Sequence, residues 1–263
     1  MSERGTVAED SGLRGRVALI TGAAAGMGRA HALALAERGA LVSVLDIDGP
    51  GAERTAAEIE QAGGSAMAWR CDVADADAAA ARRCVEAILE QHGRLDILVN
   101  NAGIGGENAR IEEVDERRFE RMFSVHARAS FFFGKHAMEP MKRQRRGRII
   151  NTASRWFMTG HETSSHYIGA KSAIVGMTKA WAKELAPYGI TANAVAPGGV
   201  WTDMVLKARG AEFIRAEERK VPLGRWAQPD EYARLVVYLA SDEAAFVTGQ
   251  VISPNGGASI VGM

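Results

Sequence analysis

The chain has 263 residues, of which 47% are hydrophobic and 24% charged, so it is long enough to bury a large core within one α/β domain. Its 32 basic and 32 acidic residues cancel, which removes any global electrostatic case for nucleic acid or an anionic membrane as partner. No apolar run approaches the roughly 20 residues of a membrane span and no apolar signal region follows the N-terminus, so we expect a cytoplasmic protein.

The first elements form a recognisable unit. Residues 1–15 are polar, lack periodicity and predict a flexible tail. An apolar strand over 17–20 then leads through a Gly-rich turn into an Ala- and Leu-rich helix that ends near residue 38, and a second strand over 41–45 closes on Asp46. A strand, a Gly-rich turn, a helix and a strand is the order that places a pyrophosphate at a helix N-terminus.

The alternation continues along the chain. Weak periodicity over 205–224 predicts a mobile insertion, and no repeat or linker divides residues 16–263, which we expect to form one domain. Alternating strands and helices predict an α/β fold with a doubly wound parallel sheet of about seven strands, covered by helices on both faces. The remaining strands are expected at 65–71, 95–99, 148–152, 190–195 and 247–253, and the helices at 53–62, 75–91, 115–142, 165–186 and from Pro229 onward.

The two cysteines, Cys71 and Cys84, fall in apparently regular segments without the spacing of metal ligands. They indicate neither a disulfide framework nor a metal site, so no metal is expected. Both are interpreted as small core residues.

Tyr167 and Lys171 are four residues apart and share one face of the expected helix. An ammonium beside a phenol favours the phenolate. Lowering the phenol pKa from its ordinary value near 10 by roughly two to three units requires about 3–4 kcal/mol of differential stabilisation. Such pairs also arise by chance, so this pair needs support from elsewhere in the chain.

That support comes from the glycine turn and from one serine. The turn reads Thr-Gly-x-x-x-Gly-x-Gly over 21–28, and Ser154 stands thirteen residues before Tyr167. With these motifs the chain resembles the short-chain dehydrogenase/reductase family from about residue 16 to 257, which implies a Rossmann-type fold. The resemblance implies that Tyr167 exchanges a proton with the substrate oxygen, that Ser154 hydrogen-bonds the same oxygen, and that Lys171 lowers the tyrosine pKa and holds the nicotinamide ribose.

Asp46 gives the sharpest cofactor inference. A carboxylate accepts hydrogen bonds from ribose hydroxyls and repels a 2′-phosphate, and the turn offers no cation, so NAD is preferred over NADP. Arg29 is interpreted as a packing or surface residue. The resemblance implies that Asp72 and Val73 contact the adenine, that residues 101–103 follow the ribose, and that 197–202 meet the nicotinamide. The expected cofactor-binding residues are Gly22, Gly26, Met27, Gly28, Asp46, Ile47, Asp72, Val73, Asn101, Ala102, Gly103, Tyr167, Lys171, Pro197, Gly198, Val200 and Thr202.

One position departs from the family pattern. Many members carry a fourth catalytic residue, an Asn in the fourth helix, where this chain has His126. A histidine can donate or accept through either ring nitrogen, so it can retain the proton relay or merely fill space. Both readings stay open.

Apolar residues flank the catalytic motifs. Trp156, Met158, Trp201 and Met204 are the expected substrate residues, and they suggest a water-poor pocket. The segment 203–224 matches the family's substrate lid in place. His161 or His166 would supply a second polar contact, although solvated loop histidines are the simpler reading.

The sequence therefore predicts an NAD-dependent oxidoreductase that interconverts a hydrophobic secondary alcohol, whether alicyclic, aromatic or long-chain, and its ketone. Two alternatives remain: a 3-oxoacyl-(acyl-carrier-protein) reductase, and a binding protein of the same fold that senses NAD without turnover. The family resemblance further implies a homotetramer or homodimer built through the long fourth and fifth helices and the C-terminal segment.

Overall fold

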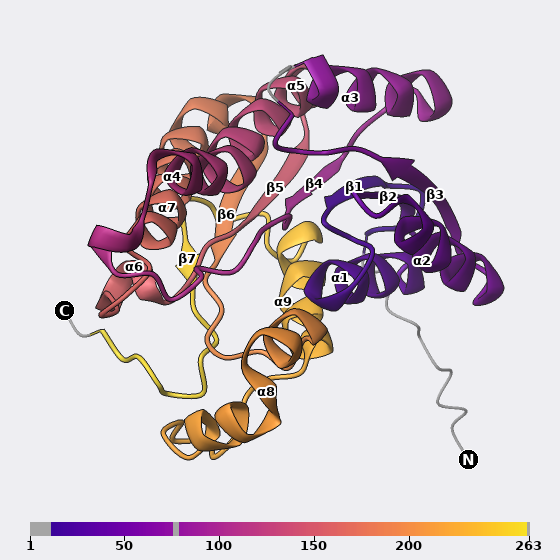
Figure 1. Cartoon of the computed structure of the whole chain (residues 1–263). Helices are drawn as coiled ribbons and strands as arrows, with labels where there is room; N and C mark the ends of the chain where they lie inside the picture. Colours follow the sequence, from indigo (N-terminus) through magenta and orange to yellow (C-terminus); the bar gives the residue numbers. More distant parts are fainter. Residues whose placement is uncertain (1–11, 76–78, 262–263) are drawn as a thin grey trace, which may run out of the picture.

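The computed structural model describes residues 12–75 and 79–261, and within them seven parallel strands form one sheet (Figure 1). The strand order is β3-β2-β1-β4-β5-β6-β7, which confirms the predicted doubly wound parallel sheet. The strands are β1 (Val17–Thr21), β2 (Leu41–Asp46), β3 (Ser65–Arg70), β4 (Ile97–Asn100), β5 (Gly147–Thr152), β6 (Ile190–Val195) and β7 (Val251–Ile252).

Helices connect the strands and cover both faces of the sheet (Figure 1). The α-helices are α1 (Gly26–Glu37), α2 (Gly49–Gln61), α3 (Ala79–His92), α4 (Glu116–Phe123), α5 (Ala129–Gln144), α6 (Trp156–Thr159), α7 (Ser165–Leu185), α8 (Asp203–Glu218) and α9 (Pro229–Ala240). Shorter turns are η1 (Ile111–Glu113), the π-helix η2 (Ser124–Arg128) and η3 (Ala186–Tyr188).

Strand periodicity divides the core into two layers. Ala18 and Ile20 of β1 point to the face covered by α1, α2 and α9, whereas Val17 and Leu19 point to the face covered by α3, α5 and α7. Successive side chains of a strand lie on opposite faces, so a strand buried on both faces is apolar throughout. This explains why β1 reads as a continuous apolar run.

Several predicted boundaries are wrong. Leu13, placed in the predicted tail, is fully buried, so the folded part begins earlier than residue 16; residues 1–11 of that tail lie outside the described residues. The predicted insertion over 205–224 is largely the helix α8, which breaks at Gly210, where φ is 77° and ψ is 161°. A glycine in that conformation interrupts the helix and weakens its periodicity.

Other corrections concern element ends. The single helix predicted over 115–142 is α4 and α5 separated by the π-helix η2, and the last strand is shortened to Val251–Ile252. The predicted start of the third helix at residue 75 lies beside residues 76–78, which are outside the described residues; α3 is described from Ala79.

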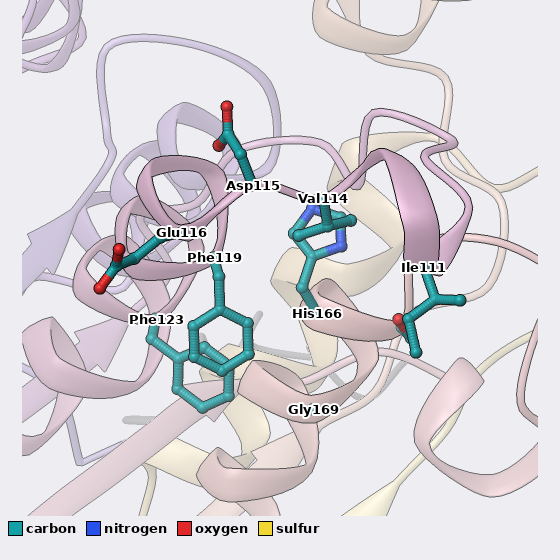
Figure 2. A pocket seen from close by; sticks show the side chains of 9 residues that line it. Ile111, Val114, Asp115, Glu116, Phe119, Phe123, His166 and Gly169 are labelled. Atoms are coloured by element: carbon teal, nitrogen blue, oxygen red, sulfur yellow. The ribbon is translucent and has the colours of Figure 1, made fainter.

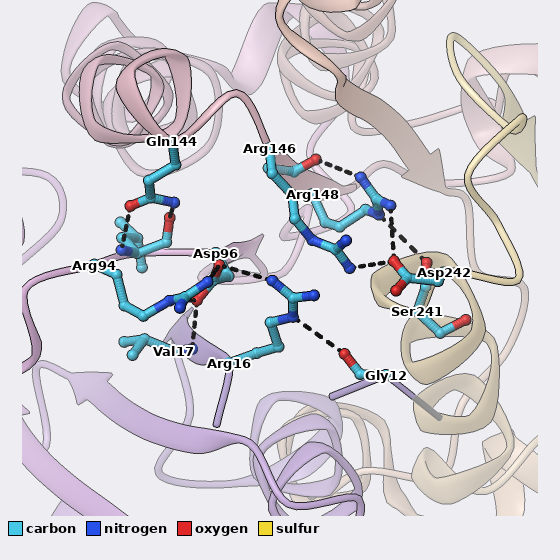
Figure 3. Close-up of polar contacts among 12 residues, drawn as sticks. Gly12, Arg16, Val17, Arg94, Asp96, Gln144, Arg146, Arg148, Ser241 and Asp242 are labelled. Atoms are coloured by element: carbon cyan, nitrogen blue, oxygen red, sulfur yellow. Dashed lines mark hydrogen bonds and ion pairs between the residues drawn. The ribbon is translucent and has the colours of Figure 1, made fainter. Parts of the chain in front are cut away.

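The amino ends of β1, β4 and β5 carry a network of charged side chains, of which Asp96 and Arg148 are buried (Figure 3). Asp96 accepts two hydrogen bonds of 2.7 Å from the Arg94 guanidinium and one of 2.9 Å from the Val17 N–H, and Arg16 lies 3.5 Å away. Burial alone raises the pKa of Asp96, but the bonds from Arg94 and Val17 outweigh it and the pKa is lowered. We call this group, together with Arg146, Arg148 and Asp242, the amino-edge network.

The carboxyl ends of the strands form the opposite edge of the sheet, which we call the carboxyl edge. The strand order reverses between β1 and β4. β1 pairs with β2 on one side and with β4 on the other, so the connections leaving these strands diverge. Ligands of open α/β sheets bind outside the carboxyl ends of the strands at such a point.

Candidate active site

Ser154, Tyr167 and Lys171 meet at the carboxyl edge of the sheet. Ser154 lies two residues beyond the end of β5, while Tyr167 and Lys171 come from the first turns of α7. The Ser154 hydroxyl lies near enough to the Tyr167 hydroxyl for a hydrogen bond that lowers the pKa of Tyr167. The Lys171 ammonium lies 5.9 Å from the centroid of the Tyr167 ring and donates a 2.7 Å hydrogen bond to the Thr152 carbonyl oxygen.

The start of α7 is fixed by the loop that follows β4. Ser164 has a left-handed backbone with φ of 65°, its N–H donates to the Ala109 carbonyl at 2.7 Å, and its hydroxyl donates to the Gly106 carbonyl. These bonds tie the N-terminus of the helix to the neighbouring connection. The tyrosine therefore stands on a constrained helical turn rather than on a free loop.

Burial dominates the electrostatics of the catalytic pair. It lowers the pKa of Lys171 to about 7, and it raises the pKa of Tyr167, although the hydrogen bond from Ser154 works in the opposite direction. The lowering of the tyrosine pKa expected from Lys171 is therefore not seen in this structure, because desolvation of the phenolate is the larger effect. Among the described residues, no carboxylate forms an ion pair with Lys171.

His126 lies beside this group in the π-helix η2. Its Nε2 is 3.3 Å from the Ile104 N–H nitrogen and 3.1 Å from the Ile104 carbonyl oxygen, so the tautomer decides which bond forms. Its ring meets the Tyr167 ring edge to face at 5.4 Å. Burial, followed by repulsion from Lys171, holds its pKa well below the ordinary value, so the ring is neutral at pH 7. Within the described residues its buried Nδ1 has no hydrogen-bond partner.

The glycine turn at the start of α1 has the shape of an anion cradle. Ala25 caps the helix with extended backbone and without a side-chain hydrogen bond, which leaves the first N–H groups free of side-chain caps. A Cβ on Gly22 would lie 2.7 Å from Ala102 Cα, and one on Gly28 would lie 2.0 Å from the Gly22 oxygen. Only glycines allow this close approach, and the exposed N–H groups fit a dinucleotide's pyrophosphate.

The carboxyl end of β2 supplies the expected ribose contact. Asp46 accepts hydrogen bonds from the Ala24 N–H at 2.9 Å and the Asp48 N–H at 3.0 Å, one at each carboxylate oxygen, and each oxygen keeps a lone pair. Ile47 beside it is 60% exposed, so its apolar side chain is accessible to the adenosine end of a dinucleotide. Arg29 pairs with Glu58 through an Nε–Oε2 contact of 3.0 Å, which agrees with its interpretation as a packing or surface residue.

Around β4 the predicted cofactor residues are held by side chains of the neighbouring strands. The Thr21 hydroxyl accepts from the N–H groups of Asn101 and Ala102 at 3.0 and 3.1 Å. Asn100 donates to Asn151 at 2.8 Å, which joins β4 to β5. Thr21 was not singled out from the sequence, although it opens the glycine motif.

Other cofactor candidates pack against the catalytic and adenosine ends. A Cβ on Gly103 would lie 2.6 Å from His126 Cε1, so the loop after β4 fits closely over the histidine. At the end of β3, Asp72 is exposed and accepts the Ala74 N–H at 2.9 Å, while Val73 is partly buried. Met27, in the first turn of α1, is partly buried against the core.

The segment after β6 faces the glycine turn. The Gly198 N–H donates to the Tyr232 hydroxyl at 3.1 Å, and Pro197 accepts the Arg155 N–H at 3.0 Å. Val200 is buried, and the Thr202 methyl would lie 3.5 Å from a Cβ on Gly26. The two ends predicted to hold one dinucleotide are thus adjacent in space.

Of the four expected substrate residues, Trp156 makes a ring contact with Tyr167. Its ring meets the Tyr167 ring edge to face at 5.9 Å and stacks on His161 at 4.2 Å. Met158 is partly buried on α6, a helix that the sequence did not predict. Met204 is 55% exposed at the start of α8.

Trp201 is held by a residue that sequence reasoning missed. Its indole N–H donates to Glu218 at 2.7 Å, and the same carboxylate oxygen accepts the Trp226 N–H at 3.1 Å. Glu218 ends α8, seventeen residues along the chain from Trp201. No local pattern joins these residues; only the folded helix brings them together.

His166 does not face the site. It lines a groove of about 380 Å³ between α4 and α7, together with the stacked rings of Phe119 and Phe123 (Figure 2). Adjacent residues of a helix point about 100° apart, so His166 turns away when Tyr167 turns inward. Its two buried ring nitrogens have no hydrogen-bond partner in the described part of the chain.

Comparison with known proteins gives a consistent result. A family model described as enoyl-(acyl-carrier-protein) reductase matches residues 22–259. The 3-oxoacyl-(acyl-carrier-protein) reductase FabG of Thermotoga maritima is 38% identical over 245 residues, covering 93% of this chain and 98% of the relative. The cis-4-hydroxycyclohexanecarboxylate dehydrogenase of Sinomonas cyclohexanicum is 38% identical over 247 residues, covering 94% and 97%.

A solved structure of a candidate NAD(P)-dependent gluconate 5-dehydrogenase from Beutenbergia cavernae superposes with a TM-score of 0.88 at 37% identity. The match covers 95% of this chain and 98% of the other, which holds NADP at low occupancy. Across residues 12–75 and 79–261, no helix is long and apolar enough to cross a membrane.

Proposed function

The chain belongs to the short-chain dehydrogenase/reductase family, and on that premise we propose that it is an NAD-dependent oxidoreductase that interconverts a hydrophobic secondary alcohol and its ketone. One observation carries the proposal: the Tyr167 hydroxyl lies within hydrogen-bonding reach of Ser154, beside a buried lysine that has no carboxylate partner among the described residues. Buried charge without a counterion costs stability, so its presence points to chemistry.

Each residue then has one task. Ser154 fixes the substrate oxygen, and Tyr167 takes the alcohol proton during oxidation or returns it during reduction. An oxidised nicotinamide held here would supply the acceptor for the hydride of the carbinol carbon and a positive charge that favours the phenolate. Lys171, with a pKa near 7, accepts or releases the proton that passes through the tyrosine, and His126 holds the adjoining loop at Ile104.

The residues present fit NAD. Gly22, Gly26 and Gly28 let the pyrophosphate approach the backbone, and Asp46 keeps a lone pair on each oxygen for the ribose hydroxyls. A 2′-phosphate beside Asp46 would be repelled, and Arg29 is engaged with Glu58. We therefore expect tighter binding of NADH than of NADPH, although the related Beutenbergia structure holds NADP.

The substrate class is proposed from the apolar surface around Tyr167 and from one relative. Trp156 presents an aromatic surface at the tyrosine, and a dehydrogenase named for a hydroxycyclohexane substrate is 38% identical. Both favour a ring-bearing secondary alcohol.

The test follows NADH absorbance while a panel of cyclic, aromatic and long-chain secondary alcohols is offered with NAD. Steady reduction of NAD that is lost in Tyr167→Phe and retained in Tyr188→Phe, whose hydroxyl is remote from Ser154, is the expected result. Full activity of Tyr167→Phe would remove Tyr167 from the mechanism.

A second candidate is a 3-oxoacyl-(acyl-carrier-protein) reductase, favoured by the 38% identity with the Thermotoga enzyme. The two functions separate on substrate and cofactor. Faster turnover of a 3-oxoacyl thioester with NADPH than of any free alcohol with NAD would favour this second function.

We propose that α8 is the substrate lid. It follows Thr202 directly, is interrupted at Gly210, and has Ile214 as its buried residue. A segment that closes over substrate excludes water from the hydride step. Slower amide hydrogen exchange in residues 203–218 when NADH and product analogue are both bound is the expected signature.

We also propose a homotetramer or homodimer built through the face of α4 and α7 that carries the groove of Figure 2. Ile111 is 78% exposed and Phe119 47% exposed on this face, which is the apolar character of a subunit contact. Light scattering should give a multiple of the 28.1 kDa chain mass, and Phe119→Glu should lower it.

A further inference from the structure

The chain contains two cysteines, and the fold brings them into contact. Cys71 follows β3 and Cys84 lies on α3, thirteen residues further along the chain. Both side chains pack against the same apolar core cluster, as expected of small core residues, but remain partly exposed. Their thiols are near enough for a side-chain hydrogen bond. Solvent therefore reaches a dithiol that is already assembled.

The two thiols have different acidities. The bond to Cys84, with burial as the second cause, raises the pKa of Cys71, which keeps its proton and donates it. The bond from Cys71, aided by the charge of Arg83, lowers the pKa of Cys84. The thiolate is the nucleophile in cysteine oxidation, so Cys84 is the thiol that reacts first and Cys71 is positioned to resolve it.

Cys71 also belongs to the wall of the expected adenosine pocket. Its N–H donates a 2.8 Å hydrogen bond to the Asp46 carbonyl oxygen, and the next residues are Asp72 and Val73. A displacement of Cys71 would therefore also move Asp46, the expected ribose ligand at the end of β2, and Asp72 and Val73, which are expected to contact the adenine.

We propose that Cys71 and Cys84 are a reversible disulfide site, oxidised by a peroxide, and that closing the disulfide weakens nicotinamide dinucleotide binding. The first half stands on the contact between the thiols alone. The second half rests on the proposed function, because it requires the dinucleotide to bind at Asp46.

The chemistry balances with hydrogen peroxide as the oxidant. The Cys84 thiolate attacks one peroxide oxygen, the O–O bond breaks, and the departing hydroxide takes up a proton to give water and a sulfenic acid at Cys84. The Cys71 sulfur then attacks the Cys84 sulfur, the S–S bond forms, the S–O bond breaks, and the thiol proton leaves with the hydroxide as a second water. Two thiols are oxidised by two electrons and one peroxide is reduced; an added dithiol reverses the change.

Closing the disulfide should distort the part of the molecule that is expected to bind the cofactor. A disulfide brings two sulfurs to about 2 Å, closer than two hydrogen-bonded thiols can lie. The end of β3 and α3 must therefore approach each other, which shifts Cys71 relative to Asp46. We expect an increase of roughly fivefold or more in the NADH dissociation constant, and by reciprocity bound NADH should shift the dithiol–disulfide equilibrium toward the dithiol by the same factor.

The experiment treats the full chain with hydrogen peroxide in the presence and absence of NADH. Intact and peptide mass spectrometry follow the loss of two hydrogens and the Cys71–Cys84 crosslink, while NADH fluorescence measures the dissociation constant before and after oxidation and after dithiol reduction. The expected result is a crosslink, weaker NADH binding and recovery on reduction. In a thiol–disulfide redox buffer at equilibrium, the crosslinked fraction should be smaller when NADH is present.

Cys84→Ser is the matched control. It keeps Cys71 and all 10 methionines, so a loss of NADH affinity caused by other oxidation would appear in this variant as well. Its NADH affinity should be insensitive to peroxide.

The outcomes separate cleanly. Thiols that stay reduced while the urea-unfolded chain crosslinks would overturn the disulfide site. A complete crosslink with unchanged NADH affinity would overturn the coupling. A reduced enzyme that binds neither NADH nor NADPH would instead refute the proposed function, with the crosslink result still standing.

Discussion

The amino and carboxyl edges of the central sheet both bury charged side chains. The buried charges are paired at the amino edge and unpaired at the carboxyl edge. At the amino edge, Asp96 is bonded by Arg94 and the Val17 N–H and faces Arg16, while the buried Arg148 meets Asp242 at 3.3 Å (Figure 3). At the carboxyl edge, Lys171 is as deeply buried and bonds to a neutral carbonyl.

The difference appears in the pKa directions. The bond to Asp96 raises the pKa of Arg94 and the pKa of Asp96 is lowered, so this pair is held charged. Burial lowers the pKa of Lys171 to about 7, so the lysine can change protonation near neutral pH. The paired charges stabilise the fold, whereas the unpaired lysine lies where the proposed reaction requires a proton to move.

The largest expected effect is a loss of activity when Lys171 at the carboxyl edge is replaced. Lys171→Met should lower kcat/KM by roughly 10²–10⁴-fold, because the proton route and the ribose contact are lost. The same change should stabilise the protein at pH 7 by about 1–4 kcal/mol, since an unpaired buried charge is replaced by an apolar side chain. Steady-state kinetics and urea unfolding measure the two effects. Lys179→Met, at an exposed position of the same helix, should change neither.

The amino edge should respond in the opposite sense. Asp96→Asn leaves the Arg94 and Arg16 cations without their buried counterion and should reduce the free energy of unfolding by about 3–5 kcal/mol. The kcat of the folded fraction should be retained. Asp230→Asn, which breaks the exposed pair with Arg234, should cost no more than about 1 kcal/mol. An Asp96→Asn variant that is inactive but keeps the full free energy of unfolding would contradict a purely stabilising role for the amino edge.

The pH dependence of stability should separate the edges further. Asp96 has a lowered pKa in the folded state, so its contribution is present above the unfolded value near 4 and is lost as the pH falls through the folded pKa. The folded pKa of Lys171 is lowered from 10.5 to about 7, so the unfolded chain binds more protons between these values and stability rises with pH across that window. Urea unfolding from pH 3 to pH 10 should show Asp96→Asn flattening the acid limb and Lys171→Met flattening the alkaline limb.

The smallest effect is expected at His126. Asn also offers one donor and one acceptor to Ile104, so His126→Asn should keep kcat within roughly threefold, whereas His126→Ala should lower it about tenfold. Because burial and Lys171 keep the ring neutral, neither variant should alter the shape of the kcat–pH profile between pH 6 and 8. A profile that shifts in His126→Asn would show that the ring itself titrates during turnover.

Much of the carboxyl edge was predictable because its motifs are local. The glycine turn, Asp46 at a strand end, and Tyr167 with Lys171 on one helical turn each depend on short spacings, so the sequence predicted their positions relative to the strands. The pKa of Tyr167 could not be read from this spacing, because the desolvation that raises it and opposes Lys171 depends on surrounding residues distant in the chain. His166 shows the same limit: one residue away from Tyr167, it lines a groove on another face.

The amino-edge network and the contact between α8 and Trp201 could not be predicted in this way. Asp96 and Arg16 are eighty residues apart in the sequence, and Arg148 and Asp242 are more than ninety residues apart. These pairs form because parallel strands align their ends. Glu218 reaches Trp201 because α8 is a helix where the periodicity predicted an insertion.

By itself the sequence determined the alternation of strands and helices, hence the parallel sheet, and it singled out the residues to which we assign the proposed chemistry, since hydrophobic period and motif spacing are properties of short segments. Tertiary structure alone decided which charges are paired, which histidine meets the tyrosine, and that Cys71 touches Cys84. Those outcomes depend on burial and on contacts between distant segments, and neither exists until the sheet and its helices have packed.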